Sequence, residues 1–333
     1  MVTSLLTPLP VLSSRCLSGT LKGYNSHHAL REIYFSSDVS LAGTLTLPEG
    51  GGTHPAIVVM HSASGGTRSY PFYRHLANNL PEHGIAVFLF DRRGSGESGG
   101  NFETADFEML AADGIAAASK LAGRDDIDAE RIGVYGISQG AWLAPIVAAR
   151  RPSTACAIIV SGSGISPARQ MDYTALRALR ENGFDESVVR RMLYLRHRID
   201  DYYRGRLSRN EVQGELDAAR SARWYSLAYL DDESGLPEDV TQDKWYFEMD
   251  YDPLPIWPMV RQPTLFLFGD DDRWVPVDES IATYKTATTD LVEVTFAKIQ
   301  GADHLMGLES EKDPHISPLY YDLLLDWLRA HLL

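Results

Sequence analysis

Short apolar runs alternate with amphipathic segments along most of the chain. Eight runs carry the β-branched and aromatic residues typical of strands: 32–35, 41–47, 56–60, 86–90, 131–135, 157–160, 264–268 and 292–296. Helical periodicity marks five further segments: 70–80, 105–121, 139–150, 278–286 and 318–332. Strands that alternate with helices predict an α/β fold, here a mostly parallel eight-stranded sheet flanked by helices.

One gap between predicted strands is much longer than the others. About a hundred residues separate the run at 157–160 from the run at 264–268, whereas an ordinary βαβ unit takes about thirty. Apolar residues within the gap recur at steps of three and four, as in an amphipathic helix: Val188, Met192, Leu195, Ile199 and Tyr202. Further helix is expected around 168–180 and 208–229.

This pattern predicts a helical cap over residues 165–255, inserted into a catalytic core made of residues 31–164 and 256–333. Residues 1–30 are interpreted as an N-terminal arm. A cap is expected to cover the carboxyl edge of the sheet, because ligand sites of open α/β sheets lie there. The alternative is a second domain with no part in the site.

Composition narrows the possible partners. The chain has 45 acidic and 31 basic residues and a net charge of −14, which disfavours nucleic-acid binding by general electrostatics. Its two cysteines provide neither a disulfide framework nor zinc-ligand spacing, and no metal or cofactor is expected. The apolar N-terminal stretch is interrupted by Pro8 and Pro10 and follows no basic residue, so we expect a cytoplasmic protein without a membrane segment, with a homodimer as a possible assembly.

Two segments match the pattern Gly-x-Ser-x-Gly, and their contexts differ. Ser138, in Gly-Ile-Ser-Gln-Gly, directly follows the run at 131–135 and precedes the helical segment at 139–150. A sharp strand-to-helix turn of this kind holds a serine exposed as a nucleophile. Ser98 lies in a loop of small and charged residues, so it is interpreted as a turn residue.

The same loop also spells Gly-x-Gly-x-x-Gly at Gly94, Gly96 and Gly99. A dinucleotide-binding fingerprint needs its glycines to open a helix immediately, so that the phosphate meets the helix N-terminus. Here Asn-Phe-Glu-Thr intervenes before the next helical segment. Nucleotide binding is therefore disfavoured.

A serine nucleophile needs an imidazole base and a carboxylate that orients it. Among the ten histidines, His304 is best placed, in the loop after the last predicted strand. Asp270, Asp271 and Asp272 directly follow the run at 264–268, and one of them is expected to be the orienting acid. The alternative is that all three are solvent-exposed turn residues with no part in catalysis.

These motifs together resemble the α/β-hydrolase superfamily, and most closely its bacterial serine aminopeptidase-like and dienelactone hydrolase-like esterases. The resemblance covers residues 32–333 and implies the order Ser138, Asp272, His304, because the acid is the fourth residue of the family pattern Gly-x-x-Asp-x-x-Val-Pro. It also implies an oxyanion hole formed by the backbone N–H groups of Ala63 and Gln139. Gln139 suits this role independently, because it begins a helix.

The resemblance and the motifs predict a serine carboxylesterase that acts on small or medium esters. Trp245, Tyr246 and Phe247 are candidate substrate-binding residues, although packing between cap and core is the alternative for each aromatic residue. Three more aromatic residues of the region share this ambiguity: Trp224, Tyr225 and Trp257.

Other functions stay open at this point. A peptidase that removes N-terminal residues would need carboxylates for the substrate ammonium group, and the cap has seven candidates: Glu233, Glu238, Asp239, Asp243, Glu248, Asp250 and Asp252. Acyl transfer and cofactor-free perhydrolysis would use the same triad. A catalytically idle binding scaffold would need no triad.

Overall fold

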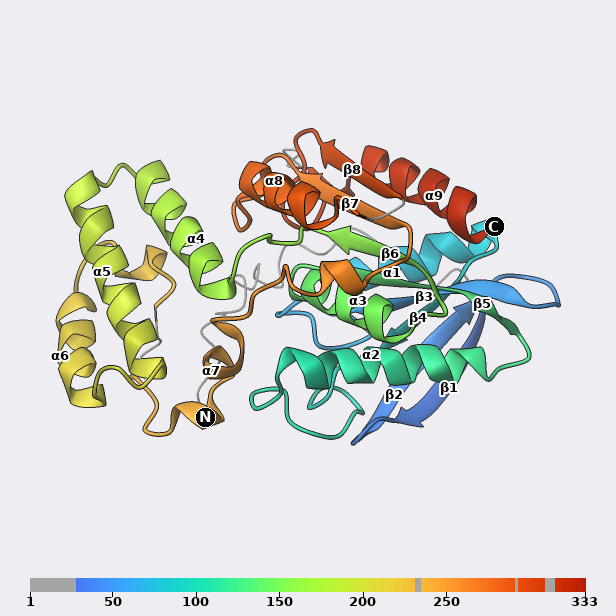
Figure 1. The fold of residues 1–333 in the computed structure, drawn as a ribbon, viewed down its shortest axis with the longest axis horizontal. Coiled ribbons are helices and arrows are strands. Elements are labelled where there is room, and N and C mark those ends of the chain that lie inside the picture. The colour runs from blue at the N-terminus through green and yellow to red at the C-terminus, as the bar shows by residue number, and fades with distance from the viewer. Residues whose placement is uncertain (1–27, 231–234, 291–292, 309–314) are drawn as a thin grey trace.

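A single twisted sheet forms the centre of the molecule (Figure 1). The computed structural model describes residues 28–230, 235–290, 293–308 and 315–333. Within them, eight strands pair in the order β1-β2-β4-β3-β5-β6-β7-β8. Their bounds are β1 Ala29–Ser36, β2 Ser40–Leu47, β3 His54–Met60, β4 Ala86–Phe90, β5 Ile127–Ile137, β6 Thr154–Val160, β7 Thr264–Gly269 and β8 Val294–Ile299. Strand β2 is antiparallel to both its neighbours, and the pairs from β4 to β8 are parallel.

Helices cover both faces of this sheet. The helices that pack on it are α1 Pro71–Asn79, α2 Phe107–Ala122, α3 Gln139–Arg150, α8 Val277–Ala287 and α9 Pro318–Leu332. Successive side chains of a strand point to opposite faces: Ala56 and Val58 of β3 join a core cluster with α2, α3 and α8, whereas Ile57 and Val59 join one with α1 and α9. Burial on both faces explains why the central strands read as continuous apolar runs.

Four α-helices of the described residues lie between β6 and β7, in the segment that we call the insertion. They are α4 Pro167–Glu181, α5 Glu186–Tyr203, α6 Arg209–Ala219 and α7 Lys244–Glu248. Figure 1 shows α4, α5 and α6 at one side of the sheet and α7 closer to it. The insertion has its own hydrophobic cluster, which includes Met192, Leu195 and Leu216.

The predicted α/β fold is confirmed, and all eight predicted strands join the main sheet. Their ends differ by a few residues, most at β5, which begins at Ile127. A two-stranded ribbon of β9 Gly307–Leu308 and β10 His315–Ile316 was not expected, because two residues leave no periodic pattern. Strand β1 begins at Ala29, inside the predicted arm, and residues 1–27 lie outside the described residues.

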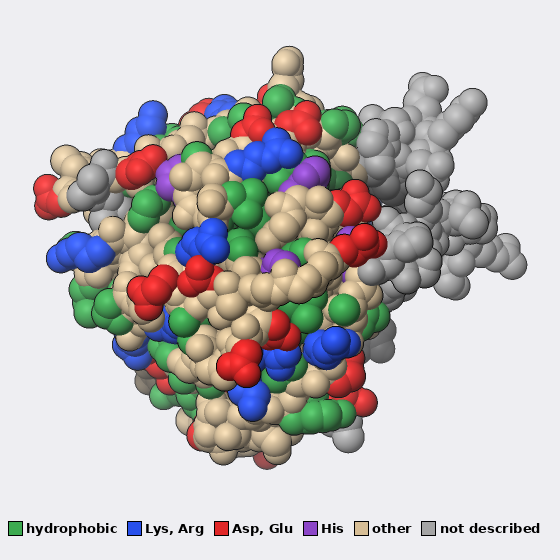
Figure 2. All heavy atoms as spheres, turned by 90° about the vertical axis from the view of Figure 1, so that its right-hand side faces the viewer, with side chains coloured by type: hydrophobic (Ala, Val, Ile, Leu, Met, Phe, Trp, Pro, Cys, Tyr) green, Lys and Arg blue, Asp and Glu red, His purple; other side chains and the backbone are tan. Residues whose placement is uncertain are grey.

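The face shown in Figure 2 carries acidic and basic side chains close together, without an extended basic area. Acidic and basic side chains are thus interspersed on this face, and the absence of a nucleic-acid partner stays a prediction. None of the helices in the described ranges combines the length and apolar composition that crossing a bilayer requires.

Candidate active site

Ser138 occupies a strained turn between β5 and α3. Its backbone has φ 55° and ψ −118°, a conformation that costs a non-glycine residue roughly 1–3 kcal/mol. Ser138 N donates to Val160 O of β6 at 2.9 Å, and Ala141 N donates back to Ser138 O at 2.9 Å. The main chain is therefore fixed on both sides of the serine.

Two glycines make this turn possible. A Cβ on Gly136 would lie 2.0 Å from Gly140 O, and a Cβ on Gly140 would lie 2.3 Å from Met60 O. Both contacts are with backbone atoms, which cannot rotate away as a side chain can. The glycines two residues before and after Ser138 are thus required by close packing of the main chain.

The three residues predicted as a catalytic set lie in direct contact. His304 Nε2 is 2.9 Å from Ser138 Oγ, and His304 Nδ1 is 2.8 Å from Asp272 Oδ2. Asp272 follows β7, and His304 lies in the loop after β8. Strands β5, β7 and β8 of one parallel sheet thus bring these side chains together at its carboxyl edge, although they are far apart in the sequence.

The loops behind His304 and Asp272 hold both side chains in place. The second oxygen of Asp272, Oδ1, accepts hydrogen bonds from Trp274 N at 2.8 Å and Val275 N at 3.0 Å. Ser161 Oγ donates to His304 O at 2.8 Å. Asp270 and Asp271 do not touch His304 through any hydrogen bond among the described residues; Asp270 Oδ1 instead accepts from Gly301 N at 2.5 Å.

The electrostatics of this set assign its protons. A carboxylate can only accept, so Nδ1 of His304 carries the proton toward Asp272, and Nε2 is left to accept from the Ser138 hydroxyl. Burial lowers the pKa of His304, but the charge and hydrogen bond of Asp272 outweigh it, with a contribution from Asp303, and raise the pKa above 6.5. The imidazolium form is thus stabilised where it would appear during proton transfer.

Two backbone N–H groups near the serine are available to a ligand. Neither Ala63 N, in the loop after β3, nor Gln139 N, at the start of α3, donates a hydrogen bond within the described residues. The first N–H groups of a helix have no partner inside it, and the dipole adds positive potential there. Such a pair can stabilise a negatively charged oxygen.

The loop that carries Ala63 is fixed by buried hydroxyl groups. Tyr73 OH accepts from Ser62 N at 2.7 Å and donates to Gly65 O at 2.8 Å. Ser62 Oγ lies 3.1 Å from Tyr73 OH and accepts from Gly65 N at 3.2 Å. Ser62 therefore helps to fix the conformation of the loop.

Two further side chains position this loop. The sequence assigned His61 to the loop by its place at the end of a strand, but no sequence pattern predicted its contact or that of Arg92. Arg92 Nη1 donates to Ser62 O at 3.1 Å and Ala63 O at 2.9 Å. His61 Nε2 donates to Phe90 O at 2.5 Å. Burial and the nearby Arg92 charge lower the pKa of His61 to about 3, so this histidine is a neutral anchor of the loop.

A buried charged group lies beside Gln139. The side-chain Nε2 of Gln139 donates to Glu248 Oε1 at 2.6 Å, and Lys244 Nζ lies 2.7 Å from the same oxygen. Gln139, Lys244 and Glu248 are all at most 3% exposed. Burial raises the pKa of Glu248 and lowers that of Lys244, and their mutual attraction opposes both shifts.

The three predicted substrate-binding aromatic residues have different surroundings. Trp245 is buried and its Nε1 donates to Asp200 Oδ1 at 2.9 Å. Tyr246 is 43% exposed, and its ring packs against that of Phe247. Trp257, an alternative candidate, is a core residue that packs on Phe266 of β7.

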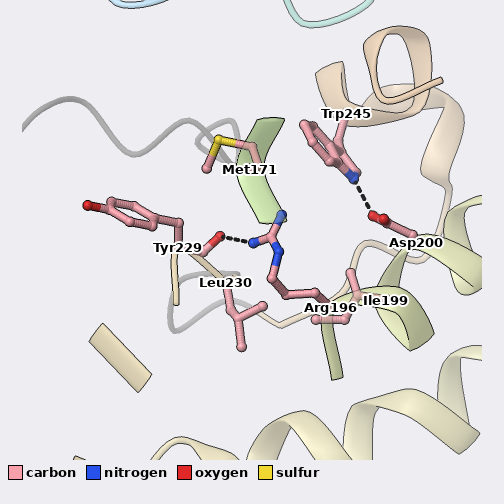
Figure 3. A pocket seen from close by; sticks show the side chains of 7 residues that line it. All are labelled: Met171, Arg196, Ile199, Asp200, Tyr229, Leu230 and Trp245. Atoms are coloured by element: carbon pink, nitrogen blue, oxygen red, sulfur yellow. Dashed lines mark hydrogen bonds between the residues drawn. The ribbon is translucent and has the colours of Figure 1, made fainter. Parts of the chain in front are cut away.

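Figure 3 shows a small cavity in the insertion, lined by Trp245 and six other residues. Arg196 crosses it and donates to Tyr229 O at 3.2 Å (Figure 3). The cavity holds about 10 Å³, which is about the space of one water molecule. The centre of the Tyr229 ring also lies 5.1 Å from that of Trp274, and the Trp274 ring centre lies 6.4 Å from that of His304. Trp274 thus lies between the side of the cavity formed by Tyr229 and the candidate catalytic histidine.

Most of the insertion's candidate carboxylates are engaged in local structure. Asp239 and Asp243 accept from backbone N–H groups at helix starts, Asp250 is paired with Arg204 at 2.6 Å, and Asp252 accepts from Leu254 N. Glu233 lies outside the described residues.

The remaining motifs have structural roles. Ser98 Oγ donates to Asp91 O at 2.6 Å and accepts from Ala42 N at 3.0 Å, as expected of a turn residue. Within the described ranges, no group of three or more His, Cys, Asp or Glu side chains is arranged to hold a metal ion.

Comparison with known proteins places this chain in a family. The family model described as "Serine aminopeptidase, S33" matches residues 53–223, just over half of the chain. The chain belongs to this family. The match includes Ser138 and the loop of Ala63, whereas Asp272 and His304 lie beyond it.

The S33-family chain also resembles curated and solved proteins. An uncharacterised protein of Mycobacterium tuberculosis is 40% identical over 105 residues, which cover 32% of this chain and 35% of the relative; the chain thus spans about a third of that relative's length. An esterase of Pyrococcus furiosus has a similar fold, with a TM-score of 0.59, 17% identity and 92% coverage of both chains. A dienelactone hydrolase of Anabaena variabilis gives a TM-score of 0.53, 17% identity and coverage of 92% and 100%. These likenesses show the α/β-hydrolase fold.

Proposed function

We propose that this hydrolase is a carboxylesterase that works through an acyl-enzyme on Ser138. The proposal depends on one observation above all: the hydrogen-bonded series from Ser138 Oγ through His304 to Asp272, with distances of 2.9 and 2.8 Å. The serine occupies a strained turn, and the N–H groups of Ala63 and Gln139 donate no hydrogen bond among the described residues. Nucleophile, base, orienting acid and oxyanion donors are the parts that acyl transfer needs.

In the first half of the reaction, Ser138 Oγ attacks the ester carbonyl while His304 Nε2 takes the hydroxyl proton. Asp272 holds the imidazole in the tautomer that can accept it and stabilises the resulting cation. The N–H groups of Ala63 and Gln139 stabilise the negative oxygen of the tetrahedral intermediate, each by roughly 3 kcal/mol of barrier. His304 then protonates the leaving alcohol, and the acyl group remains on Ser138.

In the second half, the same groups act on water. His304 removes a proton from a water molecule, which attacks the acyl carbonyl, and the proton returns to Ser138 Oγ as the acid leaves. No cofactor enters either half, since all proton transfers run through His304.

An ester substrate is favoured over a peptide with a free N-terminus. A buried ammonium group needs an unpaired carboxylate. Glu248 contacts Gln139, the residue after Ser138, but Glu248 Oε1 is already bound by both Gln139 Nε2 and Lys244 Nζ. Asp250 is paired with Arg204, and Asp239 and Asp243 each accept from a backbone N–H group. A substrate ammonium group would have to compete with these contacts.

A substrate panel tests this proposal. We expect p-nitrophenyl esters of short and medium chain length to be hydrolysed much faster than aminoacyl p-nitroanilides. Ser138→Ala should lower ester kcat/KM by roughly 10⁴-fold or more while circular dichroism stays unchanged. Faster cleavage of the anilides would replace the esterase by the peptidase, and equal ester hydrolysis by Ser138→Ala would remove Ser138 from the mechanism.

A further inference from the structure

The side chain of Gln139 is held from the insertion rather than from the sheet. Its Nε2 donates to Glu248 Oε1 at 2.6 Å across 109 residues of sequence. Its amide oxygen is buried and has no hydrogen-bond partner among the described residues. Glu248 is therefore the group that fixes the orientation of this buried amide.

Lys244, one turn before Glu248 on α7, attaches this carboxylate to the core. Its Nζ donates to Ala105 O in the loop before α2, and it lies 2.7 Å from Glu248 Oε1. The ammonium group also lies 4.5 Å from the centre of the Phe102 ring. A cation between an aromatic face, a carbonyl and a carboxylate needs all three contacts when it is buried.

Arg92 joins the oxyanion loop to the same region. Its guanidinium stacks on the Phe102 ring, which Lys244 also contacts, with Arg92 Cζ 3.3 Å from the ring centre. Arg92 Nη1 donates to Ser62 O and Ala63 O. The residues that carry the two oxyanion donors are thus supported by side chains that meet around Phe102.

Residues from the beginning and the end of the insertion meet beside this group. Met249 directly follows Glu248, and its carbonyl oxygen accepts a hydrogen bond at 3.0 Å from the backbone N–H of Ala168, which lies in the first turn of α4. Tyr251 then packs on Phe107 of α2 and Trp142 of α3, at 4.6 and 6.2 Å between ring centres. A displacement of α7 would therefore move Glu248 away from Gln139.

We propose that Glu248 is a positioning residue that acts through Gln139: it holds the oxyanion hole in its working geometry only when α7 is seated on the core. This inference rests on the proposed function. The Ser138 backbone is strained, and main-chain bonds hold it on both sides. A restraint on the side chain of Gln139 adds to them at the other end of the same peptide. The bond from Gln139 to Glu248 supplies such a restraint on the residue whose N–H faces the oxyanion.

Lys244 has a second part in this arrangement. An unpaired carboxylate near the oxyanion would repel the charge that develops there, because Coulomb interactions are strong in a buried site. The ammonium group neutralises Glu248, so the carboxylate can hold Gln139 without opposing the reaction. This explains why the pair is buried at this place although burial penalises both charges.

Two variants test the positioning role. Glu248→Gln removes the charge-assisted bond, and Gln139→Leu removes the amide but keeps the backbone N–H. Each should lower kcat by about 10-fold, a part of the roughly 10²–10³-fold lost with a whole oxyanion donor, while KM changes less than about twofold. Rates are divided by the concentration of active sites titrated with a fluorophosphonate, so a loss of folded protein does not lower the measured kcat.

The double variant decides whether Glu248 acts through Gln139. If it does, Glu248→Gln adds no further loss of kcat in the Gln139→Leu background, since coupled positions are non-additive. Independent, multiplying losses would overturn the proposal, and so would an unchanged kcat in Glu248→Gln. If Glu248→Gln does not fold, an unchanged kcat in Gln139→Leu overturns it as well.

Asp250→Asn is the matched control. Asp250 lies two residues after Glu248 and its carboxylate pairs with Arg204 at 2.6 Å, without contact with Gln139. We expect its kcat to equal that of the wild type; an equal loss in both variants would assign the effect to loosening of the insertion and contradict the proposal. A wild-type protein without esterase activity would refute the proposed function itself, whereas an active wild type with unaffected Glu248 variants refutes this inference alone.

Discussion

Each residue of the candidate site is restrained by more than one contact. Ser138 is fixed by main-chain bonds on both sides, and Asp272 uses one oxygen for His304 and the other for two backbone N–H groups. Such restraint is what a preorganised site requires, because groups held in place need little reorganisation as charge develops. The pKa of His304, raised by Asp272 against the effect of burial, follows from the same geometry.

This raised pKa predicts a pH profile. The base is neutral His304, so kcat/KM should rise with pH through an apparent pKa above 6.5. Asp272→Asn removes the charge that stabilises the imidazolium, so the apparent pKa should fall, and loss of the correct tautomer should lower kcat/KM by roughly 10⁴-fold. The profile is measured with a p-nitrophenyl ester at constant ionic strength. An inflection at the same pH in both proteins would contradict the assigned pair.

The sequence revealed the residues that perform the chemistry better than those that support it. Ser138, Asp272 and His304 each follow a strand, and such positions are recognisable because strand ends meet at one edge. Arg92, Tyr73 and Glu248 act through contacts with distant segments. No local pattern encodes these contacts, although Glu248 was among the carboxylates singled out in the insertion.

At the scale of elements, the turn between β5 and α3 depends strictly on glycine. Gly136 and Gly140 face each other closely enough that a Cβ on either one would overlap main-chain atoms. The strands and the longer helices were predictable from their periodicity. Helix α7 was not, since five residues do not establish a helical period.

Gly136→Ala should therefore destabilise the protein by about 3 kcal/mol or more, because backbone atoms must move to admit the methyl group. Gly214→Ala is the control: Gly214 lies inside α6 with open space around its Cα, so alanine should stabilise by about 0.5–1 kcal/mol. Urea unfolding followed by circular dichroism measures both. Equal stabilities of the two variants would show that the turn tolerates a side chain.

The whole molecule consists of a sheet with two core clusters and an insertion with a third. The insertion contacts the site through α7 at Gln139 and through Arg177 of α4, which donates to Asp272 O at 2.7 Å. Both the nucleophile turn and the acid loop thus depend on where the insertion sits. A cytoplasmic location and a homodimer stay predictions, as does the choice of ester.

The central claim is that Ser138 forms a covalent acyl-enzyme, and trapping that bond tests it most directly. The protein is treated with a fluorophosphonate, digested, and mapped by mass spectrometry. We expect a single adduct on the peptide that contains Ser138, no adduct in Ser138→Ala, and ester hydrolysis that disappears in proportion to labelling. An adduct on another residue, or ester hydrolysis that persists when Ser138 is fully labelled, would contradict the account.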